Sequence, residues 1–294
     1  ERNSKVWKPL AIIFGGGLLV IYIITIQNFT ISEAVGSTFN ISYIIPSLIV
    51  AACAYAIIMG GLKKVGQVAS YLVPIMCVFY IVCSLYIIFS NISELPHVFK
   101  MIFKGAFTAQ AATGGFVGAT VAKAMRLGFA RSVFSNEAGW GTSPMIHATA
   151  ETDHPIKQGI LGAFEVFTDT IVICTMTAIV IIITGYWSSG LAGANLTLTA
   201  FESVMGYGAR VVLALSIFLF GLTTITGWYT YFEIIVDHAI SDSSKIKDKI
   251  LFLLKAFYPI PGFIVVLITV LYGGTPVEIW TFADFTTVIP TFIN

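Results

Sequence analysis

Eight long apolar segments, separated by short polar connections, are the feature that most restricts what this chain can fold into. Each is roughly 20 residues long and shows no alternation, which is the length an α-helix needs to cross a bilayer. Within lipid, only helices and closed barrels satisfy every backbone hydrogen bond. The sequence therefore predicts an all-α polytopic membrane protein, in which residues 1–294 form one transmembrane domain. The predicted spans cover approximately 9–29, 43–61, 65–90, 105–129, 156–185, 204–237, 250–272 and 277–294.

The composition agrees with a membrane protein. Charged residues make up 11% of the chain, against about 25% in soluble domains, and the mean hydropathy is +0.89. The net charge of +1 argues against nucleic acid as a partner. The four cysteines lie inside apolar segments, where they are expected to pack as small residues rather than to form disulfides or a metal site.

The distribution of positive charge predicts the orientation. Of the 16 lysines and arginines, all except Lys100, Lys104 and Arg210 fall in one alternate set of connections or next to it. The positive-inside rule places that set, and the chain's start, in the cytoplasm. The chain begins with Glu1 rather than Met, and its last apolar segment stops at Asn294. We therefore expect this chain to be a fragment. Any missing N-terminal part is expected to cross the membrane an even number of times, if its own terminus is also cytoplasmic.

The span 105–129 contains adjacent glycines at its middle, Gly114 and Gly115. Together they cost about 2 kcal/mol of helix propensity relative to alanine. One interpretation is close packing of helices through small residues. The other is a broken helix, whose free backbone groups bind a substrate and a cation at the midplane. Thr113 adds a side-chain oxygen beside these glycines.

The span 204–237 places three hydroxyls, those of Thr223, Thr224 and Thr226, deep in the bilayer. Hard cations prefer oxygen ligands, which makes these threonines candidates for a sodium site. The alternative is that the hydroxyls bond back to carbonyls of the preceding turn. Trp228 lies four residues after Thr224 and shares its helix face, so it is a candidate wall of a small apolar pocket.

Acidic and amide side chains within spans form a second group of candidates. Glu165 and Asp169 lie one turn apart, and Asp169 is about 20 Å along its helix. A carboxylate at that depth indicates either an ion-linked site or a structural hydrogen bond to a neighbouring helix. Asp284 lies inside the last span, where the sequence shows no partner for it. Gln27 and Asn28 either cap the end of the first span or extend into a central cavity.

The stretch "FSNEAGWGTSPMIHATAETDHP", residues 134–155, collects reactive side chains between two spans. Ser135, His147 and Glu137 suggest a catalytic triad, but no GxSxG or HExxH motif accompanies them, and the loop faces the cytoplasm. We therefore expect no enzyme. Ser135 and Asn136 are expected to cap a short helix, with Glu137 near its positive end, and Gly139 and Gly141 to form turns. The loop is interpreted as an inner gate or hinge.

Several of these motifs together resemble the alanine/glycine:cation symporters, also called the sodium:alanine symporter family. The resemblance covers the chain from about residue 8, and it rests on "FSNEAGWGTSPMIHATAETDHPIKQG", "FEVFTDTIVICTMTA", "ISELPHVFKMIFKGAFTAQAATGGFVGATVA" and "TTITGWYTYFE". It implies membership of the APC superfamily and a LeuT-type bundle of five plus five helices in inverted repeats. This chain would then lack about two N-terminal helices, and its C-terminal end is expected to be cut as well. The even number of missing crossings agrees with the charge distribution.

The resemblance also implies roles for individual residues. Gly114, Gly115 and Phe116 would line the substrate cavity, with Trp228 as a wall. Gln27 matches a glutamine of the family and would also bind the substrate. Thr223 and Thr224 would bind sodium or substrate. The sequence departs from the family pattern at Trp140, at Phe232 and at residues 285–287.

The function expected from these observations is secondary active symport. Sodium would drive a small neutral amino acid, alanine or glycine, into the cell across the cell membrane, with no cofactor besides the coupling ion. A proton-coupled amino-acid transporter, and a channel-like or structural membrane subunit, are the alternatives. The expected partners are the amino acid and the lipid bilayer.

Overall fold

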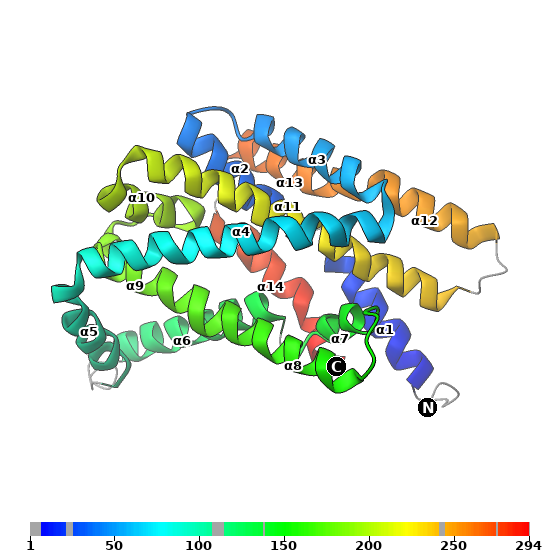
Figure 1. Cartoon of the computed structure of the whole chain (residues 1–294), viewed down its shortest axis with the longest axis horizontal. Coiled ribbons are helices and arrows are strands. Elements are labelled where there is room, and N and C mark those ends of the chain that lie inside the picture. The colour runs from blue at the N-terminus through cyan, green and yellow to red at the C-terminus, as the bar shows by residue number, and fades with distance from the viewer. Residues whose placement is uncertain are drawn as a thin grey trace.

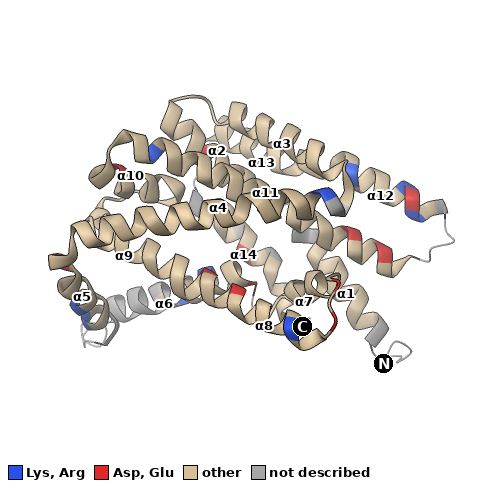
Figure 2. Cartoon of the chain, in the orientation of Figure 1, with Lys and Arg blue, Asp and Glu red and all other residues tan. Residues whose placement is uncertain are grey.

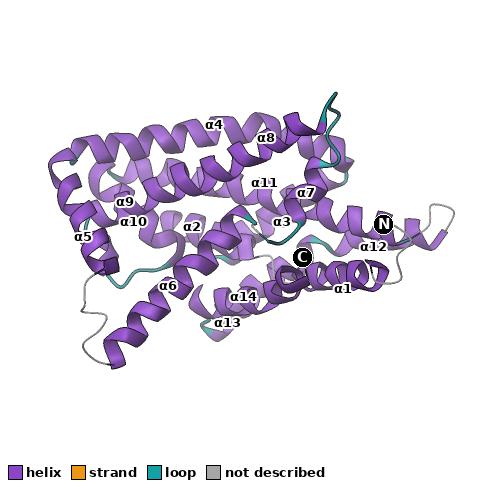
Figure 3. Ribbon diagram, turned by 90° about the horizontal axis from the view of Figure 1, so that it is seen from below, coloured by secondary structure: helices purple, strands orange, loops and turns teal. Residues whose placement is uncertain are grey.

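The computed structural model describes residues 7–21, 26–107, 115–137, 139–240, 245–274 and 276–293. Within these residues the chain forms helices and connections, and none of them lies in a strand (Figure 3). Four of the described helices are long and apolar enough to cross a membrane, over Lys64–Ser90, Pro155–Ile183, Tyr207–Ala239 and Ile246–Tyr272. Two shorter apolar helices cover Pro9–Leu19 and Ile44–Ile58. The all-helical prediction is confirmed for this part of the chain.

The first predicted span corresponds to two helices, α1 (Trp7–Ile21) and α2 (Ile26–Phe39). Helix α2 continues for ten residues beyond residue 29, the predicted end of this span. Hydropathy did not indicate this extension because it carries polar side chains such as Ser32 and Glu33, which are buried against protein. Gln27 and Asn28 consequently lie in the first turn of α2, not in the last turn of the predicted span.

The next helices follow the predicted spans closely. They are α3 (Ile44–Ile58) and α4 (Gly61–Ser90), and a short 3-10 turn, η1 (Ile92–Glu94), follows α4. Then α5 (Leu95–Phe107) occupies a stretch that was expected to be mostly connection. The predicted span 105–129 overlaps two described helices, since α5 includes residues 105–107 and α6 extends over Gly115–Asn136.

The predicted span 156–185 is one apolar rod made of three consecutive pieces. These are α8 (Pro155–Val166), a π-helix, η3 (Phe167–Cys174), and α9 (Thr175–Ile183). His154 caps the start of α8 by accepting a hydrogen bond from the amide of Ile156 at 3.2 Å, and Pro155 follows it. This N-cap residue followed by a proline is a common start for an α-helix.

The C-terminal part begins with a 3-10 turn, η4 (Tyr186–Ser188), and a helix in the expected connection, α10 (Gly193–Met205). The remaining helices are α11 (Tyr207–Ala239), α12 (Lys245–Phe257), α13 (Pro259–Tyr272) and α14 (Pro276–Ile293). The short helix α7 (Thr142–His147) lies between α6 and α8.

The long helix α11 runs through the middle of the molecule against α2, α3 and α4 (Figure 1). Helices α1 and α14, from opposite ends of the chain, pack side by side (Figure 3). Charged residues are sparse along the middle of the long helices and lie mostly toward their ends (Figure 2). Large apolar side chains such as Ile75 and Phe164 are exposed, as expected for helices whose outer faces contact lipid.

Candidate functional site

The three threonines at the centre of α11 bond within their own helix. The hydroxyls of Thr223 and Thr224 donate to the carbonyl of Phe220 at 2.8 and 2.9 Å, and that of Thr226 donates to the carbonyl of Leu222 at 3.0 Å. This is the back-bonding geometry that was the alternative to a cation site. It uses the hydroxyl protons and leaves oxygen lone pairs free to accept or to coordinate. Their role as cation ligands stays a prediction.

Helix α2 packs tightly against α11 at Gly221, just before these threonines. A Cβ built at Gly221 would lie 2.5 Å from the side chain of buried Ile31 and 3.7 Å from the carbonyl oxygen of Gln27. The side chain of Gln27 is buried, and its Oε1 has no hydrogen-bond partner among the described residues. The structure thus places the backbone of Gln27 against α11 at Gly221, which is three residues before Thr224. The role of Gln27 in binding the substrate stays a prediction.

Trp228, the predicted pocket wall, is held by Glu137 of the loop after α6. The indole Nε1 donates to Glu137 Oε1 at 3.0 Å. The hydroxyls of Tyr231 and Thr142 donate to Oε2 of the same carboxylate at 3.0 and 2.5 Å. Burial raises the pKa of the Glu137 carboxyl above its ordinary value, while these three hydrogen bonds lower it in part. Glu137 therefore fastens the loop to α11 at a residue predicted to contact the substrate.

Glu137 has a left-handed backbone with φ of 55°, which is uncommon for a residue other than glycine. Gly139 and Gly141 also have positive φ, which confirms the expected turns. The expected capping is wrong: Gly141 precedes α7, while Ser135 and Asn136 are the last residues of α6. These two side chains bond to the neighbouring rod instead of to the amides of a helix start.

Asp169 lies in the π-helix and is partly buried rather than fully enclosed. The Ser135 hydroxyl lies 2.8 Å from both oxygens of this carboxylate and donates to it. Next to this contact, Asn136 Nδ2 donates to Thr170 Oγ1 at 3.0 Å. The predicted intramembrane acid therefore ties the end of α6 to the rod of α8 and α9. Whether it is linked to an ion stays a prediction.

Glu165, one turn before Asp169, is exposed and lies 3.1 Å from His147 Nε2. Ser135 thus contacts Asp169, and His147 contacts Glu165. The hydrogen bonds of the Glu137 side chain go to other residues, namely Thr142, Trp228 and Tyr231. The three residues considered for a triad are not arranged as a nucleophile, a base and an orienting acid.

The residues predicted on the broken helix are described in part. Thr113 and Gly114 lie outside the described residues, and so does the side chain of Phe116. Gly115 is the first residue of α6, so the described helix begins at the glycine pair. The cavity wall predicted from these residues stays a prediction.

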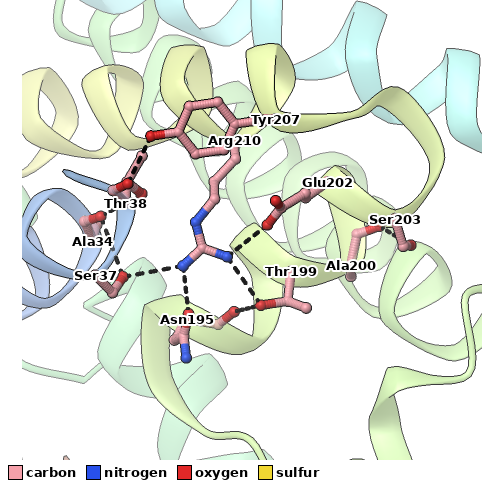
Figure 4. Close-up of polar contacts among 10 residues, drawn as sticks. All are labelled: Ala34, Ser37, Thr38, Asn195, Thr199, Ala200, Glu202, Ser203, Tyr207 and Arg210. Atoms are coloured by element: carbon pink, nitrogen blue, oxygen red, sulfur yellow. Dashed lines mark hydrogen bonds and ion pairs between the residues drawn. The ribbon is translucent and has the colours of Figure 1, made fainter. Parts of the chain in front are cut away.

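The sequence reasoning missed a polar cluster at the opposite end of α11 (Figure 4). Arg210 is 9% exposed, and its guanidinium donates to Glu202 at 2.8 Å and to Asn195 at 2.7 Å. It also donates to Thr199 and Ser37, so it joins α2, α10 and α11. Nearby, Glu33 of α2 accepts from the amide of Ala194 at 3.0 Å at the start of α10. No local pattern indicates such pairings, because the partners are up to 173 positions apart.

The comparison with protein families agrees with this helical architecture. The model of the sodium:alanine symporter family matches residues 3–294. The chain belongs to this family. Members of the sodium:alanine symporter family are transporters, which agrees with the apolar helices and with the polar side chains buried between α2 and α11.

Three curated relatives illustrate the range of this family. An uncharacterized transporter of Haemophilus influenzae is 42% identical over 206 residues, covering 69% of this chain and 45% of the relative. The probable sodium/glutamine symporter GlnT of Bacillus subtilis is 41% identical over 210 residues, covering 71% and 43%. The sodium/alanine symporter AgcS of Methanococcus maripaludis is 35% identical over 237 residues, covering 79% and 51%. The chain spans about half the length of the curated relatives it matches.

Proposed function

We propose that the chain is part of a secondary active symporter that imports a small neutral amino acid, alanine or glycine, with sodium. The family match over residues 3–294 carries this proposal. The name of the Methanococcus maripaludis relative supports alanine as substrate and sodium as coupling ion. The name of the Bacillus subtilis relative, a glutamine symporter, shows that substrates differ among relatives, so the choice of a small substrate rests on the residues below.

The proposed site lies between α2, the start of α6 and the centre of α11. Gln27 would bind polar groups of the substrate, and the backbone of Gly114 and Gly115 would approach it closely. Thr223, Thr224 and Thr113 would supply oxygens to sodium. Phe116 and Trp228 would leave room for a small side chain only, which is steric selection against larger amino acids.

The proposed setting is the cell membrane, within a LeuT-type arrangement of two inverted five-helix repeats. Lys64, Lys249 and the chain's start would face the cytoplasm, while Lys100 and Arg210 would face outward. Sodium entering with the substrate would then move charge down the membrane potential. That contributes about 2.3 kcal/mol per charge for each 100 mV.

Counterflow of labelled alanine tests this function. The protein is reconstituted in liposomes loaded with unlabelled alanine and sodium, and uptake of labelled alanine is followed. We expect saturable accumulation that needs sodium and is competed by glycine. Accumulation that persists when protons or lithium replace sodium would favour the proton-coupled alternative or a broader ion preference. Flux without saturation or exchange would indicate a channel.

We further propose that the loop of residues 135–141 acts in an inner gate. Glu137 bonds to α11 rather than to a solvent-facing partner, so it links the loop to the helix that carries the threonines. In the Glu137→Gln variant, we expect the rate of counterflow to fall more than alanine affinity, measured by binding of labelled alanine to detergent-solubilised protein. A loss of affinity that equals the loss of rate would move this loop into the binding site.

A further inference from the structure

Four aromatic side chains from separate parts of the chain meet beside Glu137. They are Phe134 of α6, Trp140 of the following loop, Trp228 of α11 and Trp280 of α14, and we call them the aromatic cluster. Phe134 is central, since its ring centroid lies 5.1 Å from that of Trp140, 6.0 Å from that of Trp228 and 5.0 Å from that of Trp280. These separations, with mostly edge-to-face geometry, are typical of attractive aromatic pairs.

The aromatic cluster leaves almost no free space. Trp140 and Trp228 are 2% and 5% exposed. The cavity between them, which Leu18, Thr142, Tyr231 and Phe232 also line, has a volume of about 10 Å³. That is the room of one water molecule at most, so no amino acid passes through the cluster in this arrangement.

An ion pair joins two of the helices that supply these rings. The Arg131 guanidinium of α6 donates to Asp284 of α14. The same guanidinium lies over the ring of Trp280, with its central carbon 4.1 Å from the ring centroid. Asp284 and Trp280 are four residues apart on one face of α14, so a single arginine holds both. This contact gives Asp284 the partner that the sequence did not show.

The position of the aromatic cluster along the helices indicates that it closes the cytoplasmic exit from the proposed site. Trp228 follows Thr224 by one helical turn, and Arg131 is one turn before Ser135 at the end of α6. In the proposed orientation, this turn of α11 and the end of α6 lie on the cytoplasmic side of the threonines. Substrate leaving the proposed site for the cytoplasm would have to pass between α6, α11 and α14.

We infer that Arg131 and Asp284 form a latch that keeps the aromatic cluster closed on the cytoplasmic side, and that this latch opens when substrate is released. The inference rests on the proposed function for its direction, but the latch itself rests on the contacts of Arg131 with Asp284 and Trp280. Arg131 is a positioning residue here, since it acts on the rings and touches no substrate.

Cysteine accessibility tests the latch without relying on transport. In a background whose four native cysteines are replaced by alanine, Leu18→Cys places a thiol on the cavity inside the cluster. Its rate of reaction with a membrane-impermeant thiol reagent is measured in inside-out vesicles. We expect Arg131→Ala and Asp284→Asn each to raise this rate at least tenfold. Asp153→Asn, which removes the exposed ion pair of Lys157, is the matched control and should leave the rate unchanged.

A second set of variants guards against general unfolding. Arg131→Lys keeps the charge but loses the planar group over Trp280, so we expect a smaller increase in rate. The double variant Arg131→Asp with Asp284→Arg restores opposite charges, and its rate should fall below that of either single reversal. Each variant is first checked for a monodisperse elution profile in detergent.

The outcomes separate the latch from the proposed function. Labelling rates of the Arg131 and Asp284 variants within about twofold of the parent, with intact elution profiles, would overturn the latch. Equal rates in the double reversal and its single variants would overturn the specific pairing. If the parent shows no sodium-dependent alanine counterflow while the variants label faster, the proposed function fails and the latch stands.

Discussion

At the scale of single residues, Trp228 has two roles that a substitution can separate. It is the proposed wall of the substrate pocket, and its indole also bonds to Glu137. Trp228→Ala removes both, and we expect it to admit larger amino acids or to weaken alanine binding. Competition of labelled alanine uptake by amino acids of increasing size measures this. Trp228→Phe is the control, because it keeps a ring but loses the hydrogen bond. Unchanged alanine affinity and specificity in Trp228→Ala would show that Trp228 is not a wall of the substrate pocket.

The buried carboxyl of Glu137 should make the stability of the folded protein depend on pH. Because burial raises the pKa of its carboxyl in the folded protein, folding favours the protonated form. This contribution to stability is complete below the ordinary pKa of 4.5 and is lost as pH rises through the raised pKa. We therefore expect the thermal unfolding midpoint in detergent to fall over that window. In Glu137→Gln this component should be missing. Parallel midpoint curves for the two proteins across the window would contradict the prediction.

Among the elements, the contact of α2 with α11 depends on a glycine. A methyl group at Gly221 would meet the side chain of Ile31 at 2.5 Å, which forces a shift in a fully packed region. Overpacking of this kind costs about 1–3 kcal/mol. We expect Gly221→Ala to lower the thermal unfolding midpoint in detergent, and Ile31→Val to restore part of it in the double variant.

Gly227 on the same helix is the matched control for this prediction. A Cβ there would meet nothing within 4 Å, and alanine is favoured over glycine in a helix by about 1 kcal/mol. Gly227→Ala should therefore leave stability unchanged or raise it. If both variants lower the midpoint equally, the loss comes from glycine replacement in general rather than from the contact with α2.

The elements also show how far the sequence predicts this fold. Spans such as 65–90 and 204–237 are found close to their predicted positions because long apolar runs have one structural solution in lipid. Helices α2 and α10 were missed or cut short because their polar residues bond to other helices, as Glu33 does to Ala194. A hydropathy pattern predicts solvent-exposed connections at such polar residues, although here they are packed against protein. For the candidate site, residue type, spacing and the resemblance to a family together supplied Gln27 and Trp228, whereas the pair of Arg131 and Asp284 required the tertiary structure.

For the whole molecule, orientation in the membrane is the property to test. Helices α5 and α10 lie at one end of the molecule and α12 at the other (Figure 1). Ser189, before α10, and Glu151, before α8, are both exposed. In the background without native cysteines, we expect an impermeant thiol reagent to label Ser189→Cys in intact cells. Glu151→Cys should be labelled after permeabilisation. The opposite pattern would invert the proposed orientation.

The π-helix of the rod, Phe167–Cys174, has a consequence for how this molecule can move. A π segment accommodates one more residue than an α-helix over the same stretch, and one residue corresponds to about 100° around a helix axis. Converting it to α-helix would therefore rotate α9 relative to α8 about the axis of the rod. The bonds of Ser135 and Asn136 to this segment oppose such a turn. These bonds hold the end of α6 against the π-helix, so α9 could not turn relative to α8 without breaking or moving them.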